Sequence, residues 1–100
     1  MEMKIPAVVG TVESSDCMVT IRPGQDGVHI DLHSDVERMF GASIRATARQ
    51  TLAELGVKNA EVDIQDRGAL DCVIRARVQC AACRSAQEPY DWSREAACNG

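Results

Sequence analysis

The first third of the chain alternates apolar and polar residues in the manner of β-strands. Strands are expected over residues 7–13 and 17–22, and a run of small polar residues lies between them. Such a run between two alternating segments predicts a tight hairpin turn. Ser14 and Ser15 are therefore expected at the exposed tip of a hairpin, where another enzyme can reach their hydroxyl groups.

A third strand and a helix are expected to follow the hairpin. Residues 28–32 alternate again, which predicts a strand with Val, Ile and Leu side chains facing inward. Ser34 and Glu37 have the spacing of a capping box, in which each side chain satisfies a backbone amide at the start of a helix. The helix is expected to run to about Leu55 and to end at Gly56, because glycine readily adopts the left-handed conformation.

One face of this expected helix carries an apolar stripe. Its members recur at helical spacing and are Val36, Met39, Phe40, Ile44, Ala48, Leu52 and Leu55. The stripe predicts that Phe40 and Ile44 belong to the core. Truncating Phe40 to alanine is accordingly expected to cost ~3–5 kcal/mol of stability.

The second half of the chain completes the expected fold. Residues 60–65 alternate as a fourth strand. The segment 69–83 fits both strand and helix spacing, and its length, alanine content and lack of a turn signal favour a helix. Beyond Arg84 the rise in Ser, Gln, Pro and Asn predicts an irregular tail. We expect a single α+β domain over 1–100, with an antiparallel sheet of about four strands and two helices on one face.

Composition excludes two classes of partner. The net charge of −4 argues against nucleic acid, because neutralising phosphates requires a basic patch. No segment approaches the ~20 apolar residues that span a membrane, and the start of the chain lacks the apolar stretch of a signal peptide. A cytoplasmic protein without a membrane partner is expected. Only three residues are aromatic, so the core must be built mainly from Val, Ile, Leu and Ala.

The number and distribution of the five cysteines are typical of a protein from a reducing compartment. Their number is odd and they are scattered through expected core elements, which is a poor disulfide framework. Cys17 and Cys72 lie in regular elements and are expected to act as small buried apolar side chains.

Cys80 and Cys83 have the Cys-X-X-Cys spacing of a metal or redox pair. A closed zinc site needs four ligands, and the other candidates are the distant Cys98, His29 and His33. The two histidines lie on the outward face of the third strand, where solvated side chains are the common outcome. We expect no metal, and a small thiol or metal-binding module remains an alternative of another functional class.

Three charged residues are candidates for supporting roles. Asp16 either stabilises the turn through its backbone or helps an attaching enzyme to recognise the site. Arg75 and Arg77 either contact phosphates of an attached group or form ordinary ion pairs on a solvated helix face, and we favour the second interpretation. Phosphate loops, nucleophile elbows and acid–base clusters are absent from the sequence, so the chain is not expected to be an enzyme.

Two long segments resemble the citrate lyase acyl carrier protein family in one register. The first is PAVVGTVESSDCMV at residues 6–19, and the second is DRGALDCVIRARV at residues 66–78. Between them, residues 36–41 and Ile44-Arg45 also sit where the family has similar residues. The resemblance therefore covers most of the chain. The Asp-Ser-Leu motif of ordinary phosphopantetheine carriers is absent.

The resemblance implies a carrier subunit with a covalent prosthetic group. In this family the serine that matches Ser14 carries 2'-(5''-phosphoribosyl)-3'-dephospho-CoA through a phosphodiester. Its thiol carries acetyl and citryl thioesters during the cleavage of citrate to acetate and oxaloacetate in citrate fermentation. The implied partners are the transferase (α) and lyase (β) subunits and the prosthetic-group transferase that modifies Ser14. The carrier subunit of malonate decarboxylase, which uses the same kind of group, is the nearest alternative.

Overall fold

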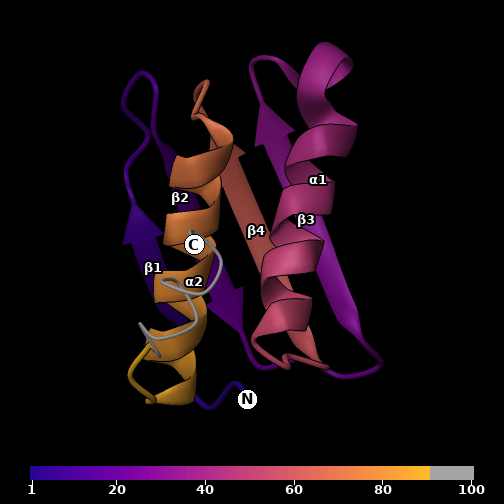
Figure 1. Cartoon of the computed structure of the whole chain (residues 1–100), viewed down its shortest axis with the longest axis vertical. Helices are drawn as coiled ribbons and strands as arrows, with labels where there is room; N and C mark the ends of the chain where they lie inside the picture. The colour runs from indigo at the N-terminus through magenta and orange to yellow at the C-terminus, as the bar shows by residue number, and fades with distance from the viewer. Residues whose placement is uncertain (91–100) are drawn as a thin grey trace, which may run out of the picture.

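The computed structural model describes residues 1–90, except for the side chain of Glu37. The elements are, in order, β1 (Ala7–Gly10), β2 (Cys17–Arg22), β3 (Val28–Ser34), α1 (Glu37–Glu54), β4 (Ala60–Asp66) and α2 (Asp71–Ala86). Figure 1 shows both helices lying across one face of a four-stranded sheet, which confirms the expected α+β architecture. Within the described residues, neither helix is long and apolar enough to cross a membrane.

The sheet is mixed, so the expectation of a purely antiparallel sheet was wrong. The strands lie in the order β1-β2-β4-β3, and the first two pairings are antiparallel. β3 pairs with β4 in parallel, with Val28 beside Ala60 and Ser34 beside Asp66. The 18-residue α1 is the reason, because it returns the chain to the level at which β3 began. Alternation along a strand is the same for both kinds of pairing and does not distinguish them.

The strand directions gather three connections at one end of the molecule. They are the β1–β2 hairpin loop (11–16), the β3–α1 connection (35–36) and the β4–α2 connection (67–70), which lie at the top of Figure 1. We call this the hairpin end. The β2–β3 and α1–β4 connections lie at the opposite end, near the N-terminus.

The core fills the space between the sheet and the two helices. Its largest fully buried apolar side chains come from β2, β4, α1 and α2, and include Val19, Ile21, Ile64, Leu52, Ile74 and Val78. Each such side chain contributes about 1.5–3 kcal/mol when it is removed from water. Leu32 of β3 is also buried, at 4% exposure, as its alternation predicted.

The ambiguous segment after residue 69 is a helix, as predicted from its length. Its buried positions recur at helical spacing, for example Ile74, Val78, Ala81 and Ser85. α2 ends before Gln87, whose φ of 59° is left-handed, so the three residues after Cys83 are helical as well. The irregular tail expected beyond Arg84 therefore begins only after Ala86: residues 87–90 form no helix or strand, and residues 91–100 lie outside the described residues.

Phe40 is not a core residue, which corrects the prediction from the apolar stripe. Its side chain is 50% exposed and that of Met39 is 79% exposed, whereas Ile44 one turn later is 3% exposed. Figure 1 shows that the first turn of α1 extends past the end of β3, so no strand lies beneath it. Helical spacing gives the direction of a side chain but not the extent of the surface that it meets. The expected cost of ~3–5 kcal/mol for Phe40→Ala is therefore too large.

Ser34 does not cap α1, so this half of the predicted capping box was wrong. α1 follows Val36 without a side-chain capping hydrogen bond, and Ser34 is the last residue of β3. The Ser34 hydroxyl accepts a bond from the Val36 N–H at 3.1 Å and donates to Asp66 Oδ2 at 2.8 Å. The Glu37 half rests on a side chain that the structure does not describe. At the other end of α1 the predicted stop is confirmed, since Gly56 has a φ of +74°.

Candidate functional site

The tip of the β1–β2 hairpin is a four-residue turn. The Asp16 N–H donates to the Glu13 carbonyl at 3.2 Å, which makes Ser14 and Ser15 the two central residues. Both serines are exposed, as predicted from the sequence. Among residues 1–90, neither hydroxyl has a hydrogen-bond partner. Both hydroxyl groups are therefore accessible to a modifying enzyme.

The two serines differ in how the backbone holds them. Ser15 has a left-handed φ of 67°, and its N–H donates to the Arg67 carbonyl at 2.8 Å. Ser15 is thereby fixed against the β4–α2 connection. In the described part of the chain, Ser14 makes no backbone bond to that connection. Ser14 is thus the less constrained of the two hydroxyl-bearing residues.

Asp16 holds the loop in one conformation through local hydrogen bonds. Its Oδ2 accepts from the Thr11 hydroxyl, and its Oδ1 accepts from the Cys17 N–H, both at 2.7 Å. The Thr11 oxygen accepts in turn from the Glu13 N–H at 3.2 Å. These bonds confirm that Asp16 stabilises the turn. Recognition of Asp16 by an attaching enzyme stays a prediction.

Arg77 of α2 reaches across to the same carboxylate. Its Nε donates to Asp16 Oδ1 at 3.1 Å and its Nη2 to Asp16 Oδ2 at 3.0 Å, a two-point pairing with defined geometry. Gly10 makes room for this pairing and has a φ of +96°. A Cβ at Gly10 would lie 3.2 Å from Arg77 Cδ and 2.0 Å from the Cys17 carbonyl oxygen. This left-handed glycine also ends β1, which is why the strand stops before residue 13.

Both arginines that the sequence singled out form ion pairs. Arg77 pairs with Asp16, and Arg75 pairs with Glu54 of α1. The favoured interpretation of ordinary ion pairs is thus confirmed for the two residues. The Arg77 pair has the added consequence of joining the hairpin to α2.

The ion pair makes the protonation of Asp16 unusual. The bonds from Arg77, Thr11 and Cys17 lower the pKa of Asp16 from 3.8 to about 2. A depressed pKa in the folded state means that the stabilising contribution of Asp16 is complete above pH 3.8 and is lost as the pH falls through about 2. We expect carbon-13 NMR to give Asp16 a titration midpoint near 2, and Arg77→Gln to move that midpoint back towards 3.8. A wild-type midpoint at 3.8 would contradict the pairing.

The hairpin is joined to the other two connections of the hairpin end through Arg67. The Arg67 N–H donates to the Asp16 carbonyl at 2.9 Å, in addition to the bond that the Arg67 carbonyl accepts from Ser15. The Arg67 side chain donates from Nε to Asp35 Oδ2 at 2.8 Å. The three connections therefore form one bonded surface around the two serines. The sequence did not reveal it, because its members are far apart along the chain.

Asp66 is a buried carboxylate beneath this surface. It is 1% exposed, and its Oδ2 accepts from the Ser34 hydroxyl and, at 3.2 Å, from the Gly68 N–H. Its Oδ1 accepts from the Ala69 N–H at 3.0 Å. A buried carboxylate is retained only where such partners satisfy it. The sequence did hold a signal for this residue, because Asp66 continues the inward register of Val62 and Ile64.

The outward histidines do not form a pair. His33 Nε2 lies 3.4 Å from Asp31 Oδ2, and the ligand atoms of Asp31, His33 and Asp63 lie within 4.8 Å of one another. His29 is not part of this cluster. Asp31 and His33 are exposed, and exposed acidic groups of this kind are common without a metal ion. We assign no metal to the cluster.

The described cysteines are free thiols. Cys17 is buried as expected, and burial raises its pKa to about 11. Cys72 is exposed, so the prediction of burial was wrong for this residue, which lies in the first turn of α2. Neither Cys80 nor Cys83 joins a cluster of metal-ligating side chains among residues 1–90. Cys98 lies outside the described residues.

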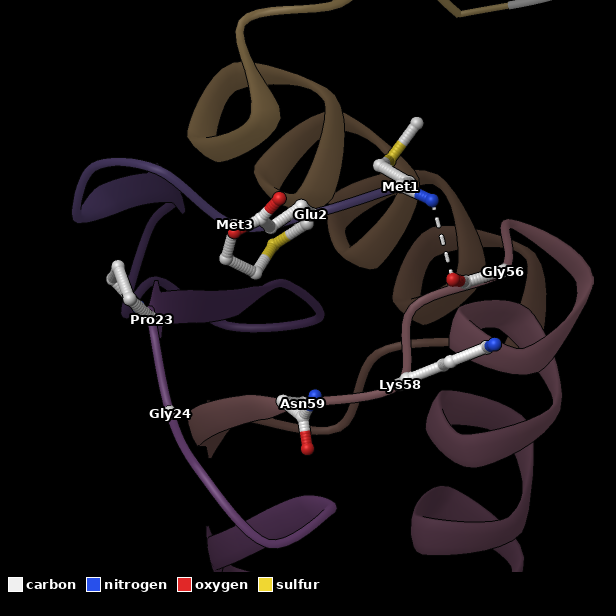
Figure 2. Close-up of a pocket in the computed structure, with 8 residues that line it drawn as sticks. All are labelled: Met1, Glu2, Met3, Pro23, Gly24, Gly56, Lys58 and Asn59. Atoms are coloured by element: carbon white, nitrogen blue, oxygen red, sulfur yellow. Dashed lines mark hydrogen bonds between the residues drawn. The ribbon is translucent and has the colours of Figure 1, made fainter.

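A hollow of about 450 Å³ lies at the end of the molecule opposite the hairpin (Figure 2). It is lined by Met1, Glu2, Met3, Pro23, Gly24, Gly56, Lys58 and Asn59. Figure 2 shows the Met1 amino group donating to the Gly56 carbonyl, at 3.2 Å. The Asn59 side chain accepts from the Gly27 N–H at 2.9 Å. These polar groups hold chain segments together, and we assign no ligand to the hollow.

Comparison with known proteins gives consistent matches over nearly the whole chain. The family model described as "Malonate decarboxylase delta subunit (MdcD)", with the short name ACP, matches residues 4–85. The citrate lyase acyl carrier protein of Klebsiella pneumoniae is 54% identical over 96 residues, which is 94% of this chain and 99% of the relative. The protein of the same name from Lacticaseibacillus casei is 48% identical over 93 residues, covering 92% of each chain.

One solved structure shares the fold at lower identity. It is the crystal structure of a Pseudomonas malonate decarboxylase hetero-tetramer in complex with malonate. A chain of that structure superposes with a TM-score of 0.66 and 26% sequence identity, over 81% of this chain and 88% of that chain.

Proposed function

We propose that this chain, which belongs to the citrate lyase acyl carrier protein family, is the acyl carrier subunit of a citrate lyase. The observation that carries the proposal is the identity of about half the residues, over nearly the full length, to relatives of that name. Its partners in this role are the transferase (α) and lyase (β) subunits, which together convert citrate to acetate and oxaloacetate. The malonate decarboxylase relative is more distant, at 26% identity.

Ser14 is the attachment residue in this proposal. It carries 2'-(5''-phosphoribosyl)-3'-dephospho-CoA through a phosphodiester, placed there by a dedicated transferase. The support is geometric, since Ser14 is exposed at the centre of a turn and its hydroxyl is unpartnered among residues 1–90. Ser15 is disfavoured because its backbone is left-handed and bonded to Arg67. Both hydroxyl groups are exposed, and the less constrained backbone at residue 14 is what favours Ser14 over Ser15.

The chain itself presents the group and performs no chemical step. When attached, the group supplies a thiol that holds the acyl cargo as a thioester. Asp16 and Arg77 fix the conformation of the hairpin, and Arg67 joins it to the domain. The carrier is thus non-catalytic, and the chemistry belongs to the partner subunits. We place it in the cytoplasm, where its free thiols remain reduced.

Mass spectrometry of the protein purified from its native host tests the attachment. We expect one covalent phosphoribosyl-dephospho-CoA per chain, and peptide mapping should place it on Ser14 with Ser15 unmodified. A group on Ser15, or an added mass of phosphopantetheine alone, would show that the assigned serine or the assigned group is wrong. Copurification with decarboxylase rather than citrate lyase subunits would favour the malonate decarboxylase carrier.

A further inference from the structure

A groove of about 460 Å³ opens at the hairpin end, between the first turns of α1 and the β4–α2 connection. Residues on both sides line it: Val36, Phe40, Ser43 and Ile44 on one, and Gly68, Ala69, Leu70 and Asp71 on the other. Of these residues Ile44 is 3% exposed, whereas Phe40 and Leu70 are 50% and 71% exposed. The lining of the groove is thus mostly apolar and includes one hydroxyl, of Ser43, and one carboxylate, of Asp71.

One wall of the groove is bonded to the turn that carries Ser14. The Ser15 N–H and the Asp16 carbonyl both bond to the backbone of Arg67, and the residues that follow Arg67 form one wall. The buried Asp66 holds that wall in one conformation by accepting bonds from the Gly68 and Ala69 N–H groups. A group attached to Ser14 therefore has to cross only the β4–α2 connection to reach a preformed apolar groove.

We propose that this groove binds the adenine ring of the prosthetic group, stacked on Phe40. The inference rests on the proposed function, which supplies the group. Adenosine is joined to the phosphoribosyl unit, so adenine is the first apolar part of the group after the phosphodiester. Its planar ring matches an exposed phenyl side chain, and the Asp71 carboxylate or the Ser43 hydroxyl can accept from its amino group. Adenine held in this way fixes the point from which the pantetheine arm and its thiol extend.

Size and tethering favour adenine over a protein segment. The groove, at about 460 Å³, falls in the range of small-molecule sites, about 300–1,000 Å³. A short tether gives an effective concentration in the millimolar range, so a weak site is enough. The pantetheine part is a poorer occupant, because its thiol has to reach active sites on partner subunits.

Titration of the unmodified, full-length protein with free adenosine, dephospho-CoA and pantetheine tests the groove by nitrogen-15 NMR. We expect adenosine and dephospho-CoA to shift the amides of Ser43, Gly68 and Ala69 with millimolar dissociation constants. Pantetheine alone should leave them unchanged. Shifts with pantetheine only, or no shift of these amides with adenosine, would overturn the proposal.

Variants at the exposed wall identify the stacking contact. Phe40→Ser should weaken adenosine binding about fivefold or more, while Phe40→Tyr should retain it, because stacking on an aromatic side chain contributes ~1–3 kcal/mol. Met39→Ser is the matched control, since Met39 is 79% exposed and does not line the groove. Equal adenosine affinity in Phe40→Ser and wild type would refute the stacking contact.

The covalently loaded protein separates this inference from the proposed function. If its mass confirms the group on Ser14, nuclear Overhauser effects between adenine protons and the Phe40 ring are expected. Their absence in a sample of confirmed mass overturns only the groove. An absent group contradicts the attachment, while the titration with free adenosine still decides the groove. If Phe40→Ser prevents assembly with partner subunits and adenosine does not bind, the groove is a protein interface and the proposal is wrong.

Discussion

Replacement of Ser14 by alanine is expected to reduce acyl loading to the detection limit while leaving the fold intact. The variant lacks the hydroxyl oxygen that forms the phosphodiester, and the remaining hydroxyl of the turn, on Ser15, is held in a different backbone conformation. An exposed turn side chain contributes little burial, so the free energy of unfolding should change by no more than about 0.5 kcal/mol. Incorporation of labelled acetyl groups and urea unfolding measure the two effects separately.

Ser15→Gly is the matched control for Ser14→Ala. Glycine tolerates the left-handed φ of residue 15 and removes the neighbouring hydroxyl, so loading should persist. Loss of loading in Ser15→Gly with full loading in Ser14→Ala would reverse the assignment of the two serines. A large loss of stability in Ser14→Ala would show that Ser14 has a structural role as well.

Truncation of Asp66 to alanine is expected to destabilise the protein by about 3–5 kcal/mol. The change removes from the buried Asp66 position the acceptor of three hydrogen bonds, which come from the Gly68 and Ala69 N–H groups and from the partly buried Ser34 hydroxyl. A cost of this size is a large share of the stability of a small domain. The urea midpoint of unfolding should fall accordingly, with an unchanged slope.

Two variants show whether the Asp66 carboxylate itself is responsible for this contribution to stability. Asp66→Asn keeps one acceptor oxygen and should lose less stability than Asp66→Ala. Asp35→Ala removes an exposed carboxylate of the same end, paired with Arg67, and should cost no more than about 1 kcal/mol. If Asp66→Ala unfolds at the wild-type urea concentration, the buried carboxylate does not hold the two connections together.

Local patterns predicted most elements of the fold because strands, turns and helices have short-range sequence signals. The hairpin tip at Ser14 and Ser15, the helical segment after Leu70 and the stop at Gly56 are confirmed. The errors concern relations between elements. The parallel pairing of β3 with β4 and the exposure of Phe40 depend on where α1 lies relative to the sheet.

The candidate site likewise has features that the sequence predicts and features that only the fold creates. The sequence by itself determined the family, the turn that presents Ser14 and the alternation that places Asp66 in an inward register, since each depends on neighbouring residues. Only the tertiary structure decided that Arg77, 61 residues from Asp16, fixes the hairpin, and that a groove opens between α1 and the β4–α2 connection at the same end of the molecule. The physical reason is that ion pairs and grooves form between segments that the fold brings together. The types of residues that lie far apart along the chain do not reveal which of them come close together in the fold.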